Sequence, residues 1–285
     1  MPFFNRIAIL GPGLLGASLG MAIRKREISK SIRVWARKQS SLQKCKEEVW
    51  CDEISSSLEE AVNACDLVVV CTPIKHIEET LRKIIPKCPE DTIITDVGSV
   101  KGSICKVAKE SSSGKGTCFI GSHPMAGSEK SGMENANAEL FENRTCMITP
   151  YPEDSIVEIE KLESFWRLLG MQVHRETPKD HDSIVSSISH LPHLIASSLA
   201  DHLASCPASW LEMAGQGFKD TTRIAQGDPA LWCEIMKSNR ENLCDSLDQW
   251  QKSVDEVRSL LHAEKWDNLT QYLSGAADHR KKIKS

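Results

Sequence analysis

A glycine-rich segment near the amino terminus constrains the fold more than any other part of this 285-residue chain. A short apolar strand pattern runs directly into G-x-G-x-x-G, and a helical pattern follows. In a strand–loop–helix unit, Gly11 permits the tight turn, Gly13 lets the backbone approach a pyrophosphate, and Gly16 lets helix and strand pack closely. The segment therefore predicts a dinucleotide-binding loop. Its predicted contact residues are Gly11, Gly13, Leu14, Leu15 and Gly16.

The next strand pattern, residues 31–36, bears on the kind of dinucleotide. In this position a carboxylate commonly binds the 2′-hydroxyl of the adenosine ribose. Here Arg37, Lys38 and Ser40 follow the strand instead, and they could hold a 2′-phosphate. The pattern favours NADP as cofactor and leaves NAD open, because Arg37 and Lys38 could also simply begin a solvated helix.

Apolar strand patterns recur along the first half of the chain, at residues 67–71 and 91–96, with helical patterns between them. Such alternation predicts a doubly wound parallel sheet. Ligands bind such sheets beyond the carboxyl ends of the strands. We therefore expect Thr72 and Pro73 to contact the cofactor and Ser99 to lie at the same edge.

His123 is a further residue that we expect just beyond the carboxyl end of a strand. It follows the apolar run 118–120, which we expect to be a buried strand, and it precedes Pro124, which disfavours helical geometry at the histidine. The pattern predicts an imidazole presented from a stiff, non-helical turn, as a general base requires. A hydrogen-bonded loop histidine without a catalytic role is the alternative.

Composition excludes several classes of function. A net charge of -4 gives no electrostatic footprint for nucleic acid. Eleven scattered cysteines indicate reduced thiols, and no apolar run approaches the ~20 residues of a membrane span or resembles a signal segment, so we expect a cytoplasmic protein without a membrane partner. His190 and His193 are separated by Pro192 and lack a clear third ligand, so we expect no metal site.

The composition changes after Glu176. Strand patterns end there, and long helical patterns follow at residues 181–204, 231–262 and 263–273. We therefore predict two domains: residues 1–176 form an α/β, Rossmann-like dinucleotide-binding domain, and residues 177–285 form an all-α domain for substrate binding and dimerisation. The basic end of the chain, residues 279–284, is expected to be a frayed, solvated terminus.

Five motifs lie in order over nearly the whole chain. They are Asp96-Val97-Gly98-Ser99-Val100-Lys101, His123-Pro124-Met125-Ala126-Gly127-Ser128-Glu129-Lys130-Ser131-Gly132, Ser189-His190-Leu191-Pro192-His193, the segment 217–225, and Asp228-Pro229-Ala230-Leu231-Trp232. With these motifs the sequence resembles the prephenate and arogenate dehydrogenases of tyrosine biosynthesis.

The resemblance implies an NADP- or NAD-dependent oxidative decarboxylation. Hydride leaves the ring carbon that carries the hydroxyl, the hydroxyl proton goes to a base, and the ring aromatises by losing its carboxylate. By position, His123 matches the family's proton acceptor, Ser99 matches the serine that hydrogen-bonds both histidine and substrate, and Arg223 matches the arginine that binds a substrate carboxylate.

The resemblance also implies further substrate contacts. They are His193, Glu129, Asp220 and Trp232. Glu129 could instead be a surface residue, Asp220 a structural partner of Arg223, and Trp232 part of the core. In the family the long helices intertwine two subunits, so a homodimer is implied. With His123 and Arg223 in different predicted domains, we expect the site for the small-molecule substrate in the cleft between them.

Two other readings stay open. A β-hydroxyacid or 6-phosphogluconate type dehydrogenase also joins a nucleotide domain to a helical one, but such enzymes generally rely on a lysine of the helical domain. An NADP-sensing protein without turnover would not need a proton acceptor and a carboxylate anchor. No residue distinguishes prephenate from arogenate.

Overall fold

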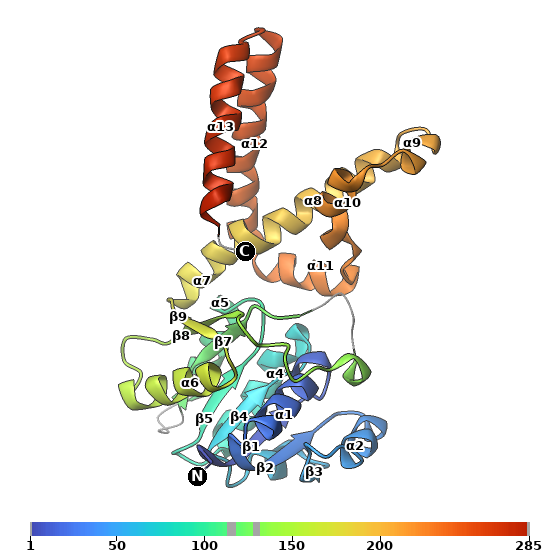
Figure 1. Ribbon diagram of the computed structural model, residues 1–285. Helices are drawn as coiled ribbons and strands as arrows, with labels where there is room; N and C mark the ends of the chain where they lie inside the picture. Colours follow the sequence, from blue (N-terminus) through green and yellow to red (C-terminus); the bar gives the residue numbers. More distant parts are fainter. Residues whose placement is uncertain (1, 113–117, 128–131, 284–285) are drawn as a thin grey trace. The chain divides into compact units, whose positions relative to one another are not determined.

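A parallel sheet forms the centre of the amino-terminal part in the computed structural model, which describes residues 2–112, 118–127 and 132–283 (Figure 1). Its strands lie in the order β3-β2-β1-β4-β5-β6, and each neighbouring pair is parallel. They are β1 (Phe4–Leu10), β2 (Ser29–Trp35), β3 (Glu53–Ser55), β4 (Leu67–Val70), β5 (Ile93–Asp96) and β6 (Cys118–Phe119). The order reverses between β1 and β4, as in a doubly wound sheet, and confirms the predicted α/β fold class.

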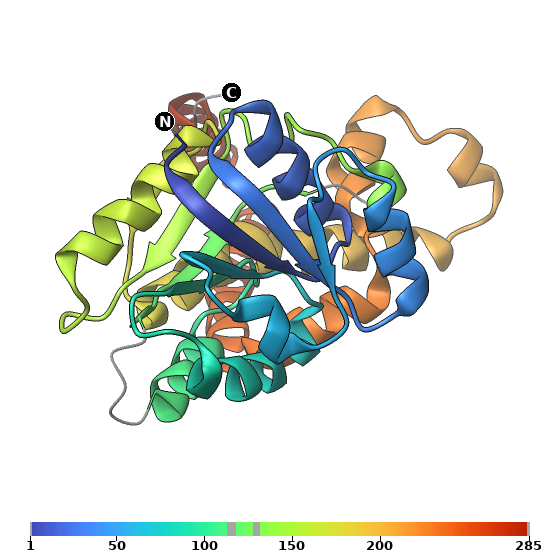
Figure 2. The same ribbon diagram turned by 90° about the horizontal axis from the view of Figure 1, so that it is seen from below.

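Both faces of this sheet are buried, which explains its continuous apolar strands. In β1, Ile7 and Ile9 join a core that includes residues of α1 and α6, whereas Ala8 and Leu10 join a second core with residues of α3, α4 and α5. Figure 2 shows helices on both sides of the strands. The helices of this part are α1 (Leu14–Lys25), α2 (Gln39–Lys46), α3 (Leu58–Val62), α4 (Ile74–Ile84), η1 (Ile85–Lys87) and α5 (Gly102–Ser111).

A second, smaller sheet follows the first. Strand β7 (Gly121–Pro124) pairs antiparallel with β8 (Thr145–Thr149), and β8 pairs parallel with β9 (Gln172–Arg175). A short 3-10 turn, η2 (Met133–Asn135), and helix α6 (Ile156–Leu168) lie between these strands in sequence. His123 lies inside β7, opposite Met147, so the prediction that it occupies a turn was wrong. Pro124 is compatible with this position because β7 is an edge strand of its sheet, and the residue before a proline favours extended geometry.

Residues 176–239 are helical. The elements are α7 (Pro178–Val185), the π-helical turn η3 (Ser186–His190), α8 (Leu191–Ala204), α9 (Ser209–Glu212), α10 (Gln216–Thr222), η4 (Arg223–Gln226) and α11 (Pro229–Ser238). The continuous helix expected from residue 231 to 262 is interrupted at Asn239, which leaves helical geometry with φ −118° and ψ 31°. Its side-chain amide instead donates a hydrogen bond to the backbone carbonyl of Asp182, 2.7 Å away.

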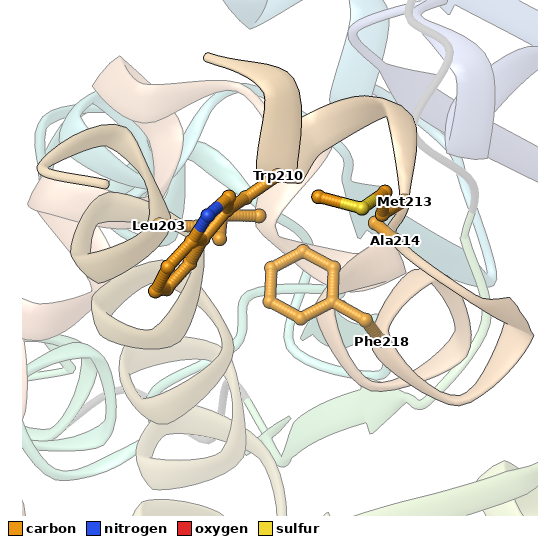
Figure 3. A pocket seen from close by; sticks show the side chains of 5 residues that line it. All are labelled: Leu203, Trp210, Met213, Ala214 and Phe218. Atoms are coloured by element: carbon orange, nitrogen blue, oxygen red, sulfur yellow. The ribbon is translucent and has the colours of Figure 1, made fainter. Parts of the chain in front are cut away.

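An exposed apolar pocket lies among α8, α9 and α10 (Figure 3). It is lined by Leu203, Trp210, Met213, Ala214 and Phe218. The Trp210 and Phe218 rings both contribute to this lining (Figure 3). Trp210 is 51% exposed and Met213 71% exposed, which is unusual for side chains of this size.

Residues 240–285 form a separate compact unit. Within its described part, α12 (Arg240–His262) and α13 (Trp266–Lys282) make a helical hairpin, with Glu264 at a positive φ of 52° in the connection (Figure 1). The basic residues 279–282 belong to the last turn of α13, where the helix dipole favours cations, and they are exposed, as expected of a solvated terminus. The expected fraying stays a prediction. None of the helices described in either unit has the length and hydropathy of a membrane span.

Candidate active site

The glycine loop between β1 and α1 has the geometry that the sequence predicted. Gly11 has φ +106°, and a Cβ there would lie 2.9 Å from the backbone of Cys71. At Gly16 a Cβ would run into the carbonyl oxygen of Gly11. At Gly13, by contrast, it would meet no protein atom within 4 Å. Packing therefore explains the first and last glycine, whereas the middle one leaves open space beside the backbone.

The loop and the adjoining Thr72, whose backbone nitrogen lies close to Gly11, offer polar groups to a ligand. Helix α1 begins at Leu14 and Leu15 without a side-chain cap and without an acidic residue in its first turn. The hydroxyl of Thr72, followed by Pro73 at the start of α4, is buried and has no hydrogen-bond partner among the described residues. An uncapped helix amino terminus attracts anions, so the loop fits the pyrophosphate of a dinucleotide.

The basic residues after β2 also lie at this edge of the sheet. Arg37, Lys38 and Ser40 are all exposed, and Lys38 precedes the first residue of α2. The Arg37 guanidinium lies 3.3 Å from the ring nitrogen Nε2 of His76, at the start of α4. These residues are available to a 2′-phosphate, although α2 does begin here, as the alternative interpretation expected.

His123 is part of a buried chain of three side chains. Its ring nitrogen Nδ1 lies 2.9 Å from Nε2 of His181 in α7. The other nitrogen of His181, Nδ1, lies 2.8 Å from the Oδ1 oxygen of Asp182. His123 is 8% exposed and His181 is 0% exposed, so the two rings contact each other away from water. These side chains connect β7 to α7, and the contacting residues His123 and His181 are 58 residues apart in sequence.

The Asp182 carboxylate lies at the amino terminus of helix α5. Its Oδ1 accepts a hydrogen bond from the backbone amide of Lys101 at 2.7 Å, and its Oδ2 accepts one from the amide of Gly102 at 2.8 Å. Burial raises the pKa of this carboxyl, but the hydrogen bonds from His181 and from the two amides outweigh that effect and lower it overall. Asp182 is therefore ionised at neutral pH.

A fully buried ion pair holds the backbone at Ser122, directly before His123. The Lys101 ammonium pairs with the Asp96 carboxylate at the end of β5 and donates a 2.9 Å hydrogen bond to the carbonyl of Ser122. Asp96 also accepts from the backbone amide of Gly98 at 2.8 Å. Because both charges are satisfied, the pair can hold the ends of β5 and β7 together in a dry environment.

The surroundings keep His123 neutral. Burial holds its pKa well below the usual range, and the nearby His181 and Lys101 act in the same direction. His190 adds a smaller effect of the same sign. An imidazole with a low pKa has its lone pair available across the whole physiological range.

The other predicted catalytic residue, Ser99, lies in the bend directly after β5 and is half-buried. No hydrogen bond joins it to His123 within the described residues. The nitrogen Nδ1 of His123 is engaged by His181, so a contact from Ser99 would have to reach Nε2. The interaction of Ser99 with the histidine stays a prediction.

His193 and Trp232 form a second aromatic contact. Their rings stack with centroids 3.6 Å apart and planes inclined by 11°. A Cβ at Gly227 would collide with the Trp232 ring, so glycine is required for this approach. The Nδ1 nitrogen of His193 and the Nε2 nitrogen of His190 are buried without a hydrogen-bond partner in the described part of the chain, which leaves each ring with an unused polar atom.

The remaining predicted substrate residues are less constrained. Arg223 begins η4 and is exposed. Asp220 accepts a 2.7 Å hydrogen bond from the Gln216 amide and, among the described ion pairs, makes none with Arg223. Glu129 lies outside the described residues. Where the structure describes side chains, no group of three or more His, Cys, Asp and Glu is arranged to hold a metal ion.

Sequence reasoning missed His181, Asp182 and the role of Lys101. His181 and Asp182 lie in an ordinary helical pattern, and their link to His123 is a contact between distant segments. Three histidines between residues 181 and 193 were the available signal, since buried histidines near a predicted base commonly contact it.

A doubly wound sheet whose first loop carries this glycine pattern is typical of dinucleotide-binding dehydrogenases. Comparison with protein families narrows the assignment. Residues 19–175 match the model of the prephenate dehydrogenase nucleotide-binding domain, and residues 177–275 match that of the prephenate dehydrogenase dimerization domain. The chain belongs to the prephenate dehydrogenase family, which confirms the resemblance seen in its motifs.

Curated relatives agree with this assignment. Prephenate dehydrogenase of Bacillus subtilis is 31% identical over 97% of this chain and 75% of its own length. Cyclohexadienyl dehydrogenase of Zymomonas mobilis is 26% identical over 100% of this chain and 98% of its own length. The shared activity of these relatives is that of a dehydrogenase, so the chain is an oxidoreductase of this kind.

Solved structures of the same family are similar to this chain. Prephenate dehydrogenase from A. aeolicus, in complex with hydroxyphenyl propionate and NAD+, superposes with a TM-score of 0.89 at 29% identity over 98% of both chains. Synechocystis arogenate dehydrogenase has a TM-score of 0.86 at 32% identity, covering 97% of this chain and 99% of its own. A 3-hydroxyisobutyrate dehydrogenase shares only the fold, with a TM-score of 0.55 at 13% identity.

Proposed function

We propose that this protein catalyses the oxidative decarboxylation of arogenate to tyrosine or of prephenate to 4-hydroxyphenylpyruvate, with NADP as the preferred cofactor. The observation that carries the proposal is the buried, neutral imidazole of His123 in a chain that belongs to the prephenate dehydrogenase family. The reaction requires a proton acceptor beside the hydroxyl of the substrate, and a base that stays neutral serves that purpose.

His123 would accept the hydroxyl proton, and Ser99 would orient the hydroxyl toward it. Bound nicotinamide supplies the hydride acceptor, which turns the ring alcohol into a ketone and allows the ring carboxylate to leave. The low pKa of His123 supports the assignment because the imidazole begins each turnover unprotonated. Exclusion of water around the ring strengthens the electrostatic interactions of the base.

Substrate recognition would fall to the helical segment. Arg223 is an exposed guanidinium, and its planar fork suits a carboxylate better than an ammonium does. The unused nitrogen of His193 offers a hydrogen bond to substrate, and Trp232 would shape the pocket by stacking on that histidine. Asp220 and Glu129 complete the proposed set.

The cofactor would bind across the glycine loop. The open space at Gly13 and the unpartnered hydroxyl of Thr72 support a pyrophosphate at the start of α1. Arg37, Lys38 and Ser40 support a 2′-phosphate and hence NADP, whereas NAD would leave these side chains in solvent.

The proposal includes the organisation of the whole chain. Residues 1–176 would act as the dinucleotide-binding domain and residues 177–285 as the helical domain for substrate binding and dimerisation, with the active site between them. The description of the carboxyl-terminal family model as a dimerization domain supports a homodimer. A cytoplasmic location is part of the same proposal.

An initial-rate matrix tests the function. Prephenate and arogenate are each assayed with NAD and with NADP, and reduced nicotinamide is followed by its absorbance. We expect turnover with at least one substrate and a higher kcat/KM with NADP than with NAD. Absence of turnover in all four combinations, by protein that still binds nucleotide, would overturn the proposed activity and leave a nucleotide-sensing protein as the explanation.

A further inference from the structure

We propose that Asp182 and His181 are positioning residues that hold His123 as the tautomer protonated at Nδ1, so that the lone pair for the substrate proton lies on Nε2. This inference rests on the proposed role of His123 as proton acceptor and adds two residues to that site. It is carried by the three-membered chain Asp182–His181–His123 and by the helix terminus that holds the chain at its far end.

The hydrogen bonds among these three side chains have a fixed donor-to-acceptor direction, because Asp182 can only accept hydrogen bonds. An ionised carboxylate has no proton to donate. Two backbone amides and the His181 ring surround the Asp182 oxygens, at 2.7, 2.8 and 2.8 Å. The hydrogen bond to His181 therefore runs from Nδ1–H of the ring to Oδ1 of the carboxylate.

The direction carries over to the next contact. A neutral imidazole with its proton on Nδ1 has a lone pair on Nε2. Burial lowers the pKa of His181, so this ring is neutral too, and its Nε2 accepts at 2.9 Å from Nδ1–H of His123. The proton of the neutral His123 ring is thereby placed on Nδ1, and Nε2 keeps the lone pair.

The same three side chains stabilise the positive charge that His123 carries after proton transfer. When the substrate hydroxyl gives its proton to Nε2, His123 becomes an imidazolium with a proton on each nitrogen. Its Nδ1–H remains bonded to His181, and the negative charge of Asp182 lies beyond that ring. Asp96 is paired with Lys101, so Asp182 is the carboxylate connected to His123 by hydrogen bonds that can offset this charge.

Helix capping alone does not explain this arrangement. Asp182 could cap α5 without any histidine, as the two amide contacts require only its carboxylate. His181 is 0% exposed and uses both ring nitrogens, one for Asp182 and the other for His123. In the Ser-His-Asp triad a carboxylate bonded directly to Nδ1–H holds the catalytic histidine in one tautomer; here the His181 ring lies between the carboxylate and the proposed base and transmits the same constraint.

The tautomer can be measured in the wild-type protein. Histidine labelled with ¹⁵N in the wild-type protein gives separate Nδ1 and Nε2 shifts, and His123→Asn assigns the signal of that ring by its disappearance. We expect His123 to carry its proton on Nδ1 at pH 7. A proton on Nε2 would overturn the inference, whether or not the protein oxidises prephenate or arogenate, so this result is separable from the proposed function.

Asp182→Asn tests the catalytic consequence. The variant loses the negative charge, and its amide nitrogen must take the place of one of the two carboxylate oxygens, Oδ1 beside Lys101 N–H and His181 or Oδ2 beside Gly102 N–H. With the nitrogen in place of Oδ1 it donates to His181, which reverses both hydrogen bonds of the relay and moves the His123 proton to Nε2; in either orientation the carboxylate that offsets the imidazolium is gone. We expect kcat to fall by about 10²-fold or more while KM and nucleotide affinity change little. Unchanged kcat would overturn the proposal. Asp180→Asn, at an exposed carboxylate two residues away, is the matched control and should behave as wild type.

His181 allows a test by partial restoration. His181→Leu removes the acceptor for His123, whereas the side-chain oxygen of His181→Gln can replace Nε2 and its amide nitrogen can donate to Asp182. We expect kcat of His181→Gln to exceed that of His181→Leu by about tenfold, the effect of one hydrogen bond. Equal activity of the two variants would indicate a merely structural role and would overturn the inference.

Discussion

His123 illustrates how an ordinary residue acquires a specific chemistry from its neighbours. On a surface its imidazole would titrate at ~6.5 and exchange tautomers freely. Between β8, Lys101 and His181 it is dry, neutral and hydrogen-bonded on one nitrogen. The single side chain thus depends on groups from three separate segments of the chain.

Replacement of this imidazole tests its role as the base. In His123→Asn we expect turnover to fall by about 10²-fold or more, because no group remains that can accept the substrate proton. Nucleotide affinity, measured by fluorescence titration, should stay close to that of the wild type because the glycine loop is untouched. A variant that turns over normally would remove His123 from the proposed mechanism.

Removal of the proposed carboxylate anchor should have a different signature. Arg223→Ala is expected to raise KM for the substrate by about 10-fold or more and to change kcat less, since the guanidinium binds ground state and transition state alike. Steady-state kinetics at saturating cofactor measure both constants. Lys219→Ala, in the same region of the helical segment, is a control for the loss of a nearby positive charge.

The depressed pKa of His123 predicts the acid side of the pH profile. A base must be unprotonated in the free enzyme, so kcat/KM falls only when the pH drops below the pKa of that base. Because burial, His181 and Lys101 lower this pKa, we expect the acid limb below the ordinary histidine value of ~6.5. A limb at or above that value, measured with a substrate that does not itself titrate there, would contradict the assignment.

At the scale of elements, the glycine loop separates structural from ligand-related requirements. Gly16→Ala should destabilise the protein by about 1–3 kcal/mol, because the added methyl runs into the carbonyl of Gly11. Gly13→Ala should leave thermal denaturation of the unliganded protein nearly unchanged and weaken nucleotide binding, because its methyl enters only the open space. Both variants are measured by calorimetry and by nucleotide titration, and each variant serves as the control for the other.

The elements themselves were largely predictable from sequence. Strands such as β4, apolar on both faces, and the stop of α6 at Gly170, with φ +88°, follow from local chemistry. The antiparallel strand β7 was not predictable, because Gly121–Pro124 has no alternating pattern and gains its extended form from pairing with β8. The break at Asn239 likewise depends on a partner in α7.

The candidate site divides in the same way. Gly11, Gly13 and Gly16 could be predicted because a loop of this kind is encoded by neighbours in sequence. The support of His123 could not, since the contact with His181 joins two segments that show no joint pattern in a single sequence. A local sequence motif therefore predicts the loop that would bind the cofactor. The residues that set the pKa and orientation of the proposed base come together only in the folded structure, so a single sequence does not predict them.

At the scale of the whole molecule, the exposed apolar surface predicts association. In the hairpin of residues 240–285, Trp266 and Leu273 are 56% and 58% exposed and lie seven residues apart, on one face of α13. We expect light scattering to report a homodimer for the wild type. A Trp266→Glu, Leu273→Glu double variant should shift the protein toward monomer, whereas Lys252→Glu on α12 should not.

Asp182 contributes to both stability and catalysis, two properties of which protein engineering commonly improves one at the expense of the other. Active-site groups are commonly strained or poorly satisfied, so that replacing them raises thermostability at the cost of turnover. Here the same carboxylate begins helix α5 and, through His181, orients the proposed base. A screen for heat-resistant variants should therefore retain aspartate at this position without any selection for activity, and libraries that randomise it should lose robustness and catalysis together.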